Sequence, residues 1–346
     1  MKILGYKNID RVEWRRLVQS SSTSTWFQSP EAYDFYASMP ALFRPFAIGL
    51  ACAPAWTQTQ LRAVCIGYVT VEKSALKQMM TRRAIIVGGP CLADDCSDDE
   101  VRELMSAVRK ELKGEAIYVE SRNFNDYSRW KYAFADAGFD YVPHLNFHVD
   151  TSSVDVVETN LGKSRKRDIK TTIRDGVSIV ELSNEGISEL ERERMVHEYY
   201  EILSNLYKTK VKTPLFPESF FQALAKHPDG RFLLTEYNGK IIGGTVCVAQ
   251  EDKCLYEWFA CGEDGVYPHV FPSCYATYAG IKYAAEHGMP RFDMMGAGKP
   301  DEVYGVRDFK AKFGGKEVEH GRFLCITKPL LYKIGVLGVK ILKKLK

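Results

Sequence analysis

The sequence lacks the features that mark several familiar classes of protein. None of its nine cysteines belongs to a Cys-x-x-Cys pair, and its formal net charge is only +3. The longest uncharged apolar stretch, Pro45 to Trp56, contains two prolines and is too short to span a bilayer. No apolar run of signal-peptide length follows the N-terminus. We therefore expect a cytoplasmic protein with reduced, buried cysteines, and not a nucleic-acid binder that depends on overall charge.

Motifs of common cofactor and catalytic sites are also absent. The chain has no Walker loop, no Gly-x-Gly-x-x-Gly fingerprint and no Gly-x-Ser-x-Gly elbow. His144 and His148 share one face of an expected strand, but no cysteine or acid completes a metal site, so we interpret both as structural. The sequence predicts no metal and no resident cofactor.

Positive charge is concentrated in two short segments. Residues 163–174 carry six Lys or Arg and one acid, and residues 328–346 carry six lysines and no acid. Such patches favour contact with phosphate groups or an anionic surface, and a solvated helix face is the equally open alternative. In the tail, leucines and isoleucines recur at helical spacing with lysines opposite. This pattern predicts a basic amphipathic helix, which either lies on the inner membrane surface or docks on the core.

Apolar periodicity indicates the fold class. Helical spacing at 98–112, 188–206 and 273–286 alternates with runs rich in β-branched residues, and Asn238-Gly239 predicts a hairpin. Both helices and antiparallel strands therefore recur along the chain. We predict an α/β (α+β) fold in which each half holds a mixed, mostly antiparallel sheet flanked by helices.

The length of 346 residues favours two domains. A polar segment after Val149 places the boundary near residue 151, which gives domains 1–150 and 151–317. The remaining segment, 318–346, is expected to pack back on the first domain. The order of elements is similar in the two halves, which suggests an internal duplication.

The most unusual stretch is FDMMGAGKPDEVYGVRDFKAKFGG, residues 292–315. Its glycines allow close approach of a ligand or backbone with positive φ, although an ordinary tight connection is the alternative. If residues 309–313 form a strand, Phe309 and Phe313 share one face and Lys310 and Lys312 share the other. Lysines beside a glycine loop favour a phosphate-bearing substrate. Asp293, at the expected strand tip, either takes a proton from an attacking amine or fixes the loop.

At this point the sequence resembles a known family. The run above, with LGKSRKRDIK upstream and FQSPEAYDFY near the start, is similar to the FemAB-type nonribosomal peptidyl transferases. Gly88-Gly89-Pro90 and Tyr256-Glu257-Trp258 extend the resemblance over most of the chain. It implies two GNAT-like domains and attack of a substrate amine on an activated acyl group. Well-studied members take the amino acid from aminoacyl-tRNA and add it to a cell-wall precursor.

The resemblance also implies the residues of the site. The family's Phe-Lys pair at the transfer centre matches Phe309 and Lys310, and a lysine cation there can stabilise the developing oxyanion. Asp293 joins them as a candidate catalytic residue. The candidates for substrate binding are Gly296, Gly298, Tyr304, Arg307, Tyr256, Tyr36, Arg165 and Lys166.

Two departures from the family pattern leave the acceptor open. Tyr36 stands where the family places a lysine for a diphosphate, and the stretch 206–212 offers lysines in place of an arginine. The expected acceptor is therefore an amine of a cell-envelope precursor, either a peptidoglycan stem peptide or a lipid or sugar amine.

The expected donor is aminoacyl-tRNA. Acyl-CoA enzymes of the GNAT fold hold the pyrophosphate with amides of a glycine-rich loop, whereas the matching segment here, GEDGVYPHVFPSCYATYAG, contains prolines that lack the amide donor. Two alternatives stay open. One is an acyl-CoA-dependent N-acyltransferase of surface polysaccharide synthesis, and the other is a non-catalytic module that binds RNA or membrane.

Overall fold

The structure is a computed structural model that describes residues 1–52, 60–72, 81–183 and 186–344, with the backbone alone for 338–344. The chain forms two compact units: Met1–His144 together with Glu319–Lys346, and Leu145–Val318. The boundary falls after His144 rather than after residue 150, because residues 145–150 form a strand that pairs within the second sheet.

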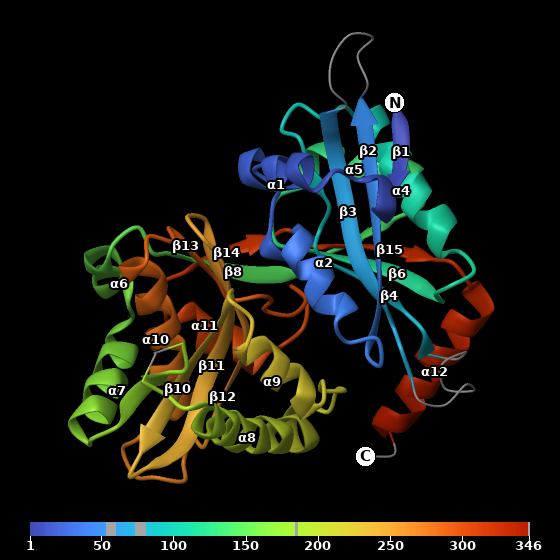
Figure 1. Ribbon diagram of the computed structural model, residues 1–346. Coiled ribbons are helices and arrows are strands. Elements are labelled where there is room, and N and C mark those ends of the chain that lie inside the picture. The colour runs from blue at the N-terminus through green and yellow to red at the C-terminus, as the bar shows by residue number, and fades with distance from the viewer. Residues whose placement is uncertain (53–59, 73–80, 184–185, 345–346) are drawn as a thin grey trace. The chain divides into compact units, whose positions relative to one another are not determined.

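The first unit is built on an eight-stranded mixed sheet (Figure 1). Its strand order is β1-β2-β3-β4-β6-β15-β7, and β5 pairs with β3 off this path. The strands are β1 (Lys2–Gly5), β2 (Phe43–Cys52), β3 (Gln60–Thr70), β4 (Ala84–Gly88), β5 (Cys91–Leu92), β6 (Tyr118–Asn123), β7 (Asp140–Val142) and β15 (Arg322–Ile326).

Helices cover both faces of this sheet. They are η1 (Tyr6–Asn8), α1 (Arg11–Ser20), η2 (Trp26–Gln28), α2 (Pro30–Ala37), α4 (Asp98–Leu112), η3 (Ser128–Trp130) and α5 (Lys131–Asp136). The predicted apolar stripe of α4, which includes Val101 and Leu104, is fully buried in the core that α4 and α5 share with the sheet. On the other face, Tyr36 of α2 packs against Tyr68 of β3, with ring centroids 4.9 Å apart.

The second unit contains a seven-stranded sheet in the order β14-β8-β13-β12-β11-β10-β9. The strands are β8 (Leu145–Asp150), β9 (Ser178–Glu181), β10 (Gly230–Tyr237), β11 (Lys240–Gln250), β12 (Cys254–Gly262), β13 (Arg291–Asp293) and β14 (Lys316–Glu319). The predicted hairpin is confirmed, because Asn238 and Gly239 turn between β10 and β11 with φ of 51° and 76°. Only β12 and β13 among the described pairs of this sheet run parallel, so the sheet is mixed and mostly antiparallel, as predicted.

Two helix layers flank this sheet. The helices are α6 (Val154–Asn160), α7 (Lys163–Arg174), α8 (Glu189–Leu206), the π-helix η4 (Tyr207–Val211), α9 (Glu218–Ala225), α10 (Pro272–Glu286) and α11 (Gly305–Ala311). Side chains alternate between the two faces of β10, so neighbouring residues contact different helix layers. Phe232 packs against Tyr199 of α8, whereas Leu233 joins the core that contains α10. The central helix α10 therefore lies against the face opposite α8.

The C-terminal helix α12 (Pro329–Lys344) extends from the first unit. Leu330, Ile334 and Leu337 lie on one side of its first turns and are 79%, 54% and 59% exposed. Leu331, also predicted for this face, is half-buried. The remaining apolar residues predicted for it, Ile341, Leu342 and Leu345, lie outside the described side chains. Among the helices of the described residues, none is long and apolar enough to cross a membrane.

The cysteines occur as predicted. All nine are free thiols, and all but Cys52 are buried. They act as small apolar groups in the two cores, where burial raises the pKa of thiols such as Cys96, to about 11.

Candidate functional site

The segment around Lys310 is helical, not extended. Residues 305–311 form α11, so the prediction of alternating faces at 309–313 is wrong. Phe309 and Phe313 nevertheless share a side, with ring centroids 5.2 Å apart. A spacing of four residues brings side chains to one face in both a strand and a helix, which is why the sequence pattern did not separate the two. Lys312, by contrast, no longer shares a face with Lys310.

The Lys310 side chain points inward to the glycine loop. Its Nζ donates hydrogen bonds to the carbonyl oxygens of Met294 and Gly296, the second at 2.8 Å. Burial lowers the pKa of the ammonium, while the carboxylates of Glu257 and Asp293 act in the opposite direction. An ammonium has three N–H donors, and two are used within the described part of the chain. The third can serve an oxygen of a bound substrate.

The strands beside this loop separate. β12 and β13 pair only at Leu255↔Phe292 and Tyr256↔Asp293, after which β13 ends and β12 continues to Gly262. A bulge interrupts the pairing of β12 with β11 just beyond this point. In the first unit the parallel strands β4 and β6 are paired along the full length of β4, from Ala84↔Val119 to Gly88↔Asn123. The central parallel pairing therefore ends after two residue pairs in the second unit, whereas it continues for five in the first.

Glu257 is the residue of β12 that follows the two residues paired with β13. It is buried, and its Oε1 accepts hydrogen bonds from Thr277 of α10 at 2.8 Å and from Thr245 of β11 at 3.3 Å. Burial raises the pKa of Glu257, and the nearby Lys310 ammonium opposes that change. The buried carboxylate of Glu257 and the half-buried ammonium of Lys310 are thus close enough to influence each other's pKa.

Asp293 ends β13 and is fully buried. Its Oδ1 accepts from the side-chain amide of Asn146 at 2.7 Å and from the backbone N–H of Met295 at 2.8 Å. Its Oδ2 lies 3.1 Å from Nε2 of His148. Asn146 uses its own oxygen to accept from the N–H of Gly296, at 2.8 Å. The carboxylate therefore fixes the start of the loop through Oδ1, and its Oδ2 lies beside a histidine.

Arg307 holds the rest of the glycine loop. Its guanidinium donates to the carbonyl oxygens of Ala297, Lys299 and Pro300. Gly298 has φ of 80°, and a Cβ there would lie 2.9 Å from the Tyr304 ring. The loop residues predicted to bind substrate are thus brought together, with Tyr304 exposed at the start of α11.

Arg165 and Lys166 lie on α7. The Arg165 guanidinium stacks over the rings of Phe309 and Phe313, at 4.4 and 5.0 Å, and pairs with Asp168. Arg165 is only 9% exposed. By packing on these two rings, Arg165 supports α11 and the residues after it. Lys166 is half-buried, and its contact with an anionic substrate stays a prediction.

Two predicted binding residues lie deep in the two cores. Tyr256 is fully buried on β12, where its hydroxyl donates to Oε1 of Gln250. Tyr36 is 1% exposed in the first unit, and burial raises its pKa well above the ordinary value. The binding roles of both tyrosines stay predictions.

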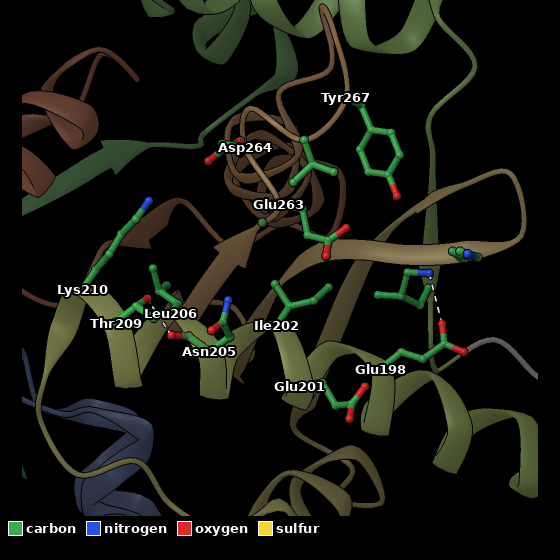
Figure 2. A pocket seen from close by; sticks show the side chains of 14 residues that line it. Glu198, Glu201, Ile202, Asn205, Leu206, Thr209, Lys210, Glu263, Asp264 and Tyr267 are labelled. Carbon is green, nitrogen blue, oxygen red and sulfur yellow. Dashed lines mark hydrogen bonds between the residues drawn. The ribbon is translucent and has the colours of Figure 1, made fainter.

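A pocket of about 600 Å³ lies elsewhere in the second unit, between α8, η4 and the segment after β12 (Figure 2). Acidic side chains contribute much of its lining: Glu198, Glu201, Glu263 and Asp264. The Asp264 carboxylate accepts the N–H of Ser273 in the first turn of α10, at 3.2 Å. The preceding helical residue is Pro272, which has no N–H. This helix start is therefore poorly suited to a pyrophosphate, as the sequence predicted.

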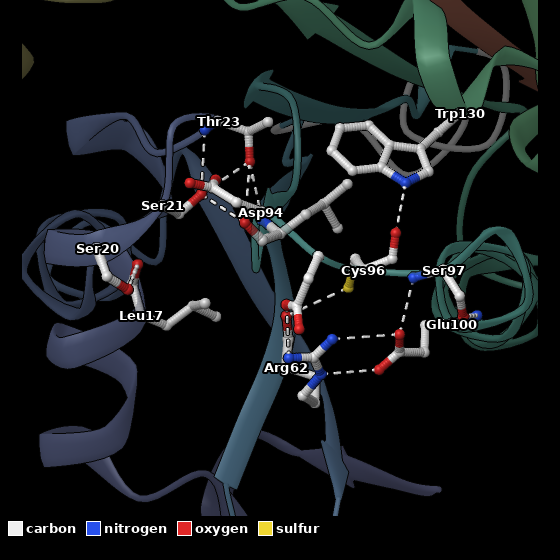
Figure 3. Close-up of polar contacts among 12 residues, drawn as sticks. Leu17, Ser20, Ser21, Thr23, Arg62, Asp94, Cys96, Ser97, Glu100 and Trp130 are labelled. Carbon is white, nitrogen blue, oxygen red and sulfur yellow. Dashed lines mark hydrogen bonds and ion pairs between the residues drawn. The ribbon is translucent and has the colours of Figure 1, made fainter.

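The corresponding helix start in the first unit is also occupied by the protein's own groups (Figure 3). Ser97 and Glu100 form a capping box on α4. Glu100 also accepts from Nε of Arg62 at 2.9 Å, and Arg62 pairs with Asp95. A carboxylate and its arginine thus occupy the place where an anion would otherwise bind the helix.

Sequence reasoning missed Asn146 and Glu257 and treated His148 as structural. Glu257 belongs to the Tyr256-Glu257-Trp258 motif, but nothing in the neighbouring sequence indicated that its carboxylate is buried. Asn146 and His148 alternate along β8, and that spacing was the one available signal. No group of three or more His, Cys, Asp or Glu side chains within the described ranges could hold a metal ion.

The comparisons with known proteins agree with this geometry. Residues 163–310 match the family model described as "Acetyltransferase (GNAT) domain". The matched residues lie within the second unit and include Lys310. The whole chain has the fold of FemX. It superposes on that structure with a TM-score of 0.69 at 12% identity, covering 96% of this chain and 99% of FemX.

Two further solved structures share the two-unit fold. The C-terminal domain of a putative lysylphosphatidylglycerol synthetase from Agrobacterium fabrum has a TM-score of 0.57 at 13% identity, covering 96% of this chain and 95% of that chain. A tandem GNAT protein from the clavulanic acid biosynthesis pathway has a TM-score of 0.55 at 10% identity, covering 94% and 98%. No curated protein sequence matches the chain. The shared property is the tandem GNAT fold.

Proposed function

We propose that this protein is an aminoacyltransferase that forms an amide bond on an amine of a cell-envelope precursor, with aminoacyl-tRNA as the donor. The observation that carries the proposal is the Lys310 ammonium. It is half-buried beside the loop after β13, where the pairing of β13 with β12 ends, and one of its N–H donors remains for a substrate oxygen. Attack of an amine on an ester creates an oxyanion, and a fixed cation at that point stabilises it.

The surroundings of α10 support aminoacyl-tRNA over acyl-CoA. CoA-dependent enzymes place a pyrophosphate at the start of the central helix, where free backbone N–H groups and the helix dipole attract it. Here Pro272 removes one donor and the Asp264 carboxylate takes the next. Glu263, also in the pocket lining, adds a second negative charge nearby. An ester-linked amino acid needs no pyrophosphate at this position.

The C-terminal helix supports an acceptor at a membrane surface. The three exposed apolar residues Leu330, Ile334 and Leu337 repeat at helical spacing, and the sequence places lysines on the other side of the helix. An amphipathic helix of this kind binds anionic lipid through buried apolar area and charge attraction. One fold relative is named a putative synthetase of lysylphosphatidylglycerol, an aminoacylated lipid. A lipid-linked amine is therefore our first choice of acceptor.

The donor is tested with the purified full chain and labelled substrates. Aminoacyl-tRNA charged with radiolabelled amino acids and radiolabelled acetyl-CoA are each offered with a panel of amines: peptidoglycan stem-peptide precursors, amino sugars and amine-bearing lipids in vesicles. We expect label to move from tRNA to one class of acceptor and none to move from CoA. Transfer from acetyl-CoA would overturn the choice of donor. RNA binding without transfer to any amine would show a non-catalytic module instead.

A further inference from the structure

One face of α7 collects the positive charges of the basic segment. An α-helix turns by about 100° per residue, so five of its cations fall within an arc of roughly 100°. These five residues, which we call the α7 stripe, are Lys163, Lys166, Arg167, Lys170 and Arg174. All of them are exposed except Lys166, which is half-buried. The buried residues of α7 lie on its other side: Arg165, Asp168, Ile169 and Thr172.

The α7 stripe carries more positive charge than the neighbouring carboxylates balance. Arg167 pairs with Asp168 at 3.0 Å and Arg174 with Asp175 at 3.3 Å, yet the two arginine side chains stay 76% and 73% exposed. Within the described ranges, no carboxylate forms an ion pair with any of the three lysines of the stripe. A surface with excess positive charge of this kind attracts phosphate groups.

The start of α7 is held against the segment that carries Lys310. The backbone N–H of Gly162, the N-cap residue of α7, donates to the carbonyl oxygen of Lys312 at 3.1 Å. On the inward side of α7, the Arg165 guanidinium stacks over two phenylalanine rings of the same segment, at 4.4 and 5.0 Å. From this end the stripe extends about 16 Å along the helix axis to Arg174, since each residue rises 1.5 Å.

We propose that the α7 stripe binds the phosphate backbone of the donor RNA, so that the 3′ end with its amino acid ester reaches Lys310. The inference rests on the proposed function and adds to it the surface that holds the RNA. A row of cations three turns long matches several successive phosphates, and such contacts position a nucleic acid without reading its sequence.

A membrane surface fits α7 less well than RNA does. A helix that lies on a bilayer buries a whole apolar face in the lipid. By contrast, α7 exposes a single large apolar side chain, that of Ile173, and Ile169 is buried in the core of the second unit. Its attraction for a partner is therefore mainly that of charge for charge.

The first test measures binding and needs no transfer reaction. A labelled RNA hairpin with the acceptor stem and single-stranded 3′ end of a tRNA is titrated with the full chain over a range of salt concentrations. The double variant Lys163→Gln/Lys170→Gln should bind about 10-fold more weakly or worse near physiological salt. The slope of log K against log salt should become shallower by about 0.7–0.9 for each lysine removed.

The matched control is Lys110→Gln/Lys113→Gln, which removes two exposed lysines at the end of α4 in the first unit. It changes the net charge by the same amount and should bind the hairpin within about twofold of the wild type. A difference between the two double variants therefore reports the position of the charges and not their number.

The second test compares the same variants in the transfer reaction. Lys163→Gln/Lys170→Gln should raise KM for aminoacyl-tRNA about 10-fold, with kcat and KM for the amine within about twofold of the wild type. A donor shortened to the last few aminoacylated nucleotides cannot extend along the stripe. Lys170 lies about 10 Å along the helix from Lys163, so Lys170→Gln should leave KM for the short donor within about twofold.

Hairpin binding by the Lys163→Gln/Lys170→Gln variant equal to that of the wild type would overturn the inference, even if transfer occurs. No hairpin binding by the wild-type chain would overturn it as well. Loss of binding to phosphatidylglycerol vesicles, with RNA binding unchanged, would assign the stripe to a membrane instead. A wild-type chain that binds RNA through the stripe but transfers nothing would count against the proposed function and not against this surface.

Discussion

The side-chain oxygen of Asn146 accepts a hydrogen bond from the backbone N–H of Gly296 at 2.8 Å. This bond ties β8, which lies next to the edge strand of the second sheet, to the loop after β13. Asn146 is 4% exposed, and it also accepts from the N–H of Phe147 and donates to Asp293. The buried Asn146 amide therefore holds the loop after β13, whose Gly296 carbonyl accepts a hydrogen bond from Lys310.

Replacement of Asn146 by alanine should destabilise the second unit by about 1–3 kcal/mol, because it leaves buried N–H groups and a carboxylate without their partner. Urea denaturation gives the free energy of unfolding, and hydrogen exchange at residues 294–298 locates the loss in the loop. Asn205→Ala, at an exposed site on α8, is the control and should stay within about 0.5 kcal/mol. Equal stability of the two variants would contradict the role given to Asn146.

Removal of the Lys310 charge should reduce turnover while the neighbouring lysine should not matter. Lys310→Met should lower kcat about 100- to 1,000-fold, the cost of losing one donor to an oxyanion. Lys312→Met is the matched control, because Lys312 is exposed and on another side of α11, and it should keep kcat within about twofold. Steady-state kinetics of label transfer measures both. Unchanged turnover in Lys310→Met would reject the proposed transfer centre.

Gly314 should tolerate alanine far less well than Gly176, although both have positive φ. A Cβ at Gly314 would lie 2.3 Å from the carbonyl oxygen of Asn160, whereas one at Gly176 would meet nothing within 4 Å. Gly176→Ala should cost about 1–2 kcal/mol from backbone strain alone. Gly314→Ala should cost about 2–4 kcal/mol, because overpacking adds to that strain. Thermal unfolding of the pair would refute this if their stabilities were equal.

Glu120 should make the first unit sensitive to acid. Burial by itself raises its pKa, but Arg122 and Arg322 outweigh it and lower the pKa from 4.5 to about 2. Since the folded pKa is the lower one, this stabilisation is fully present above pH 4.5 and is lost as the pH falls towards about 2. The change should approach about 3 kcal/mol, because each pKa unit is worth about 1.4 kcal/mol.

Hydrogen exchange of the β6 and β15 amides across this pH range measures the effect, because Glu120 and Arg322 lie on these strands. Glu120→Gln should be less stable at neutral pH and should lose most of the dependence. Glu103→Gln, at an exposed site on α4, should keep the wild-type profile. A wild-type curve that is flat between pH 5 and about 2 would contradict the assignment.

Local sequence patterns determined most of the secondary structure. The apolar spacing of α4 and the Asn-Gly turn of the β10–β11 hairpin each gave the correct element, because helix periodicity and positive φ are properties of a few neighbouring residues. The similar order of elements in the two halves suggested a duplication, and the family resemblance implied the tandem GNAT-like fold. The stretch 309–313, considered as a possible strand, begins within a helix. The sequence did not decide this, because a four-residue spacing of phenylalanines fits both a strand and a helix.

The candidate site depended on tertiary structure. The glycine loop and the Phe309-Lys310 pair were visible in the sequence. The partners of Lys310 were not, since they are backbone carbonyls 16 and 14 residues earlier in the chain. Asp293 meets His148 only because two strands far apart in sequence pair in one register. Register between distant strands is set by the packing of whole sheet faces, and no short stretch of sequence encodes it.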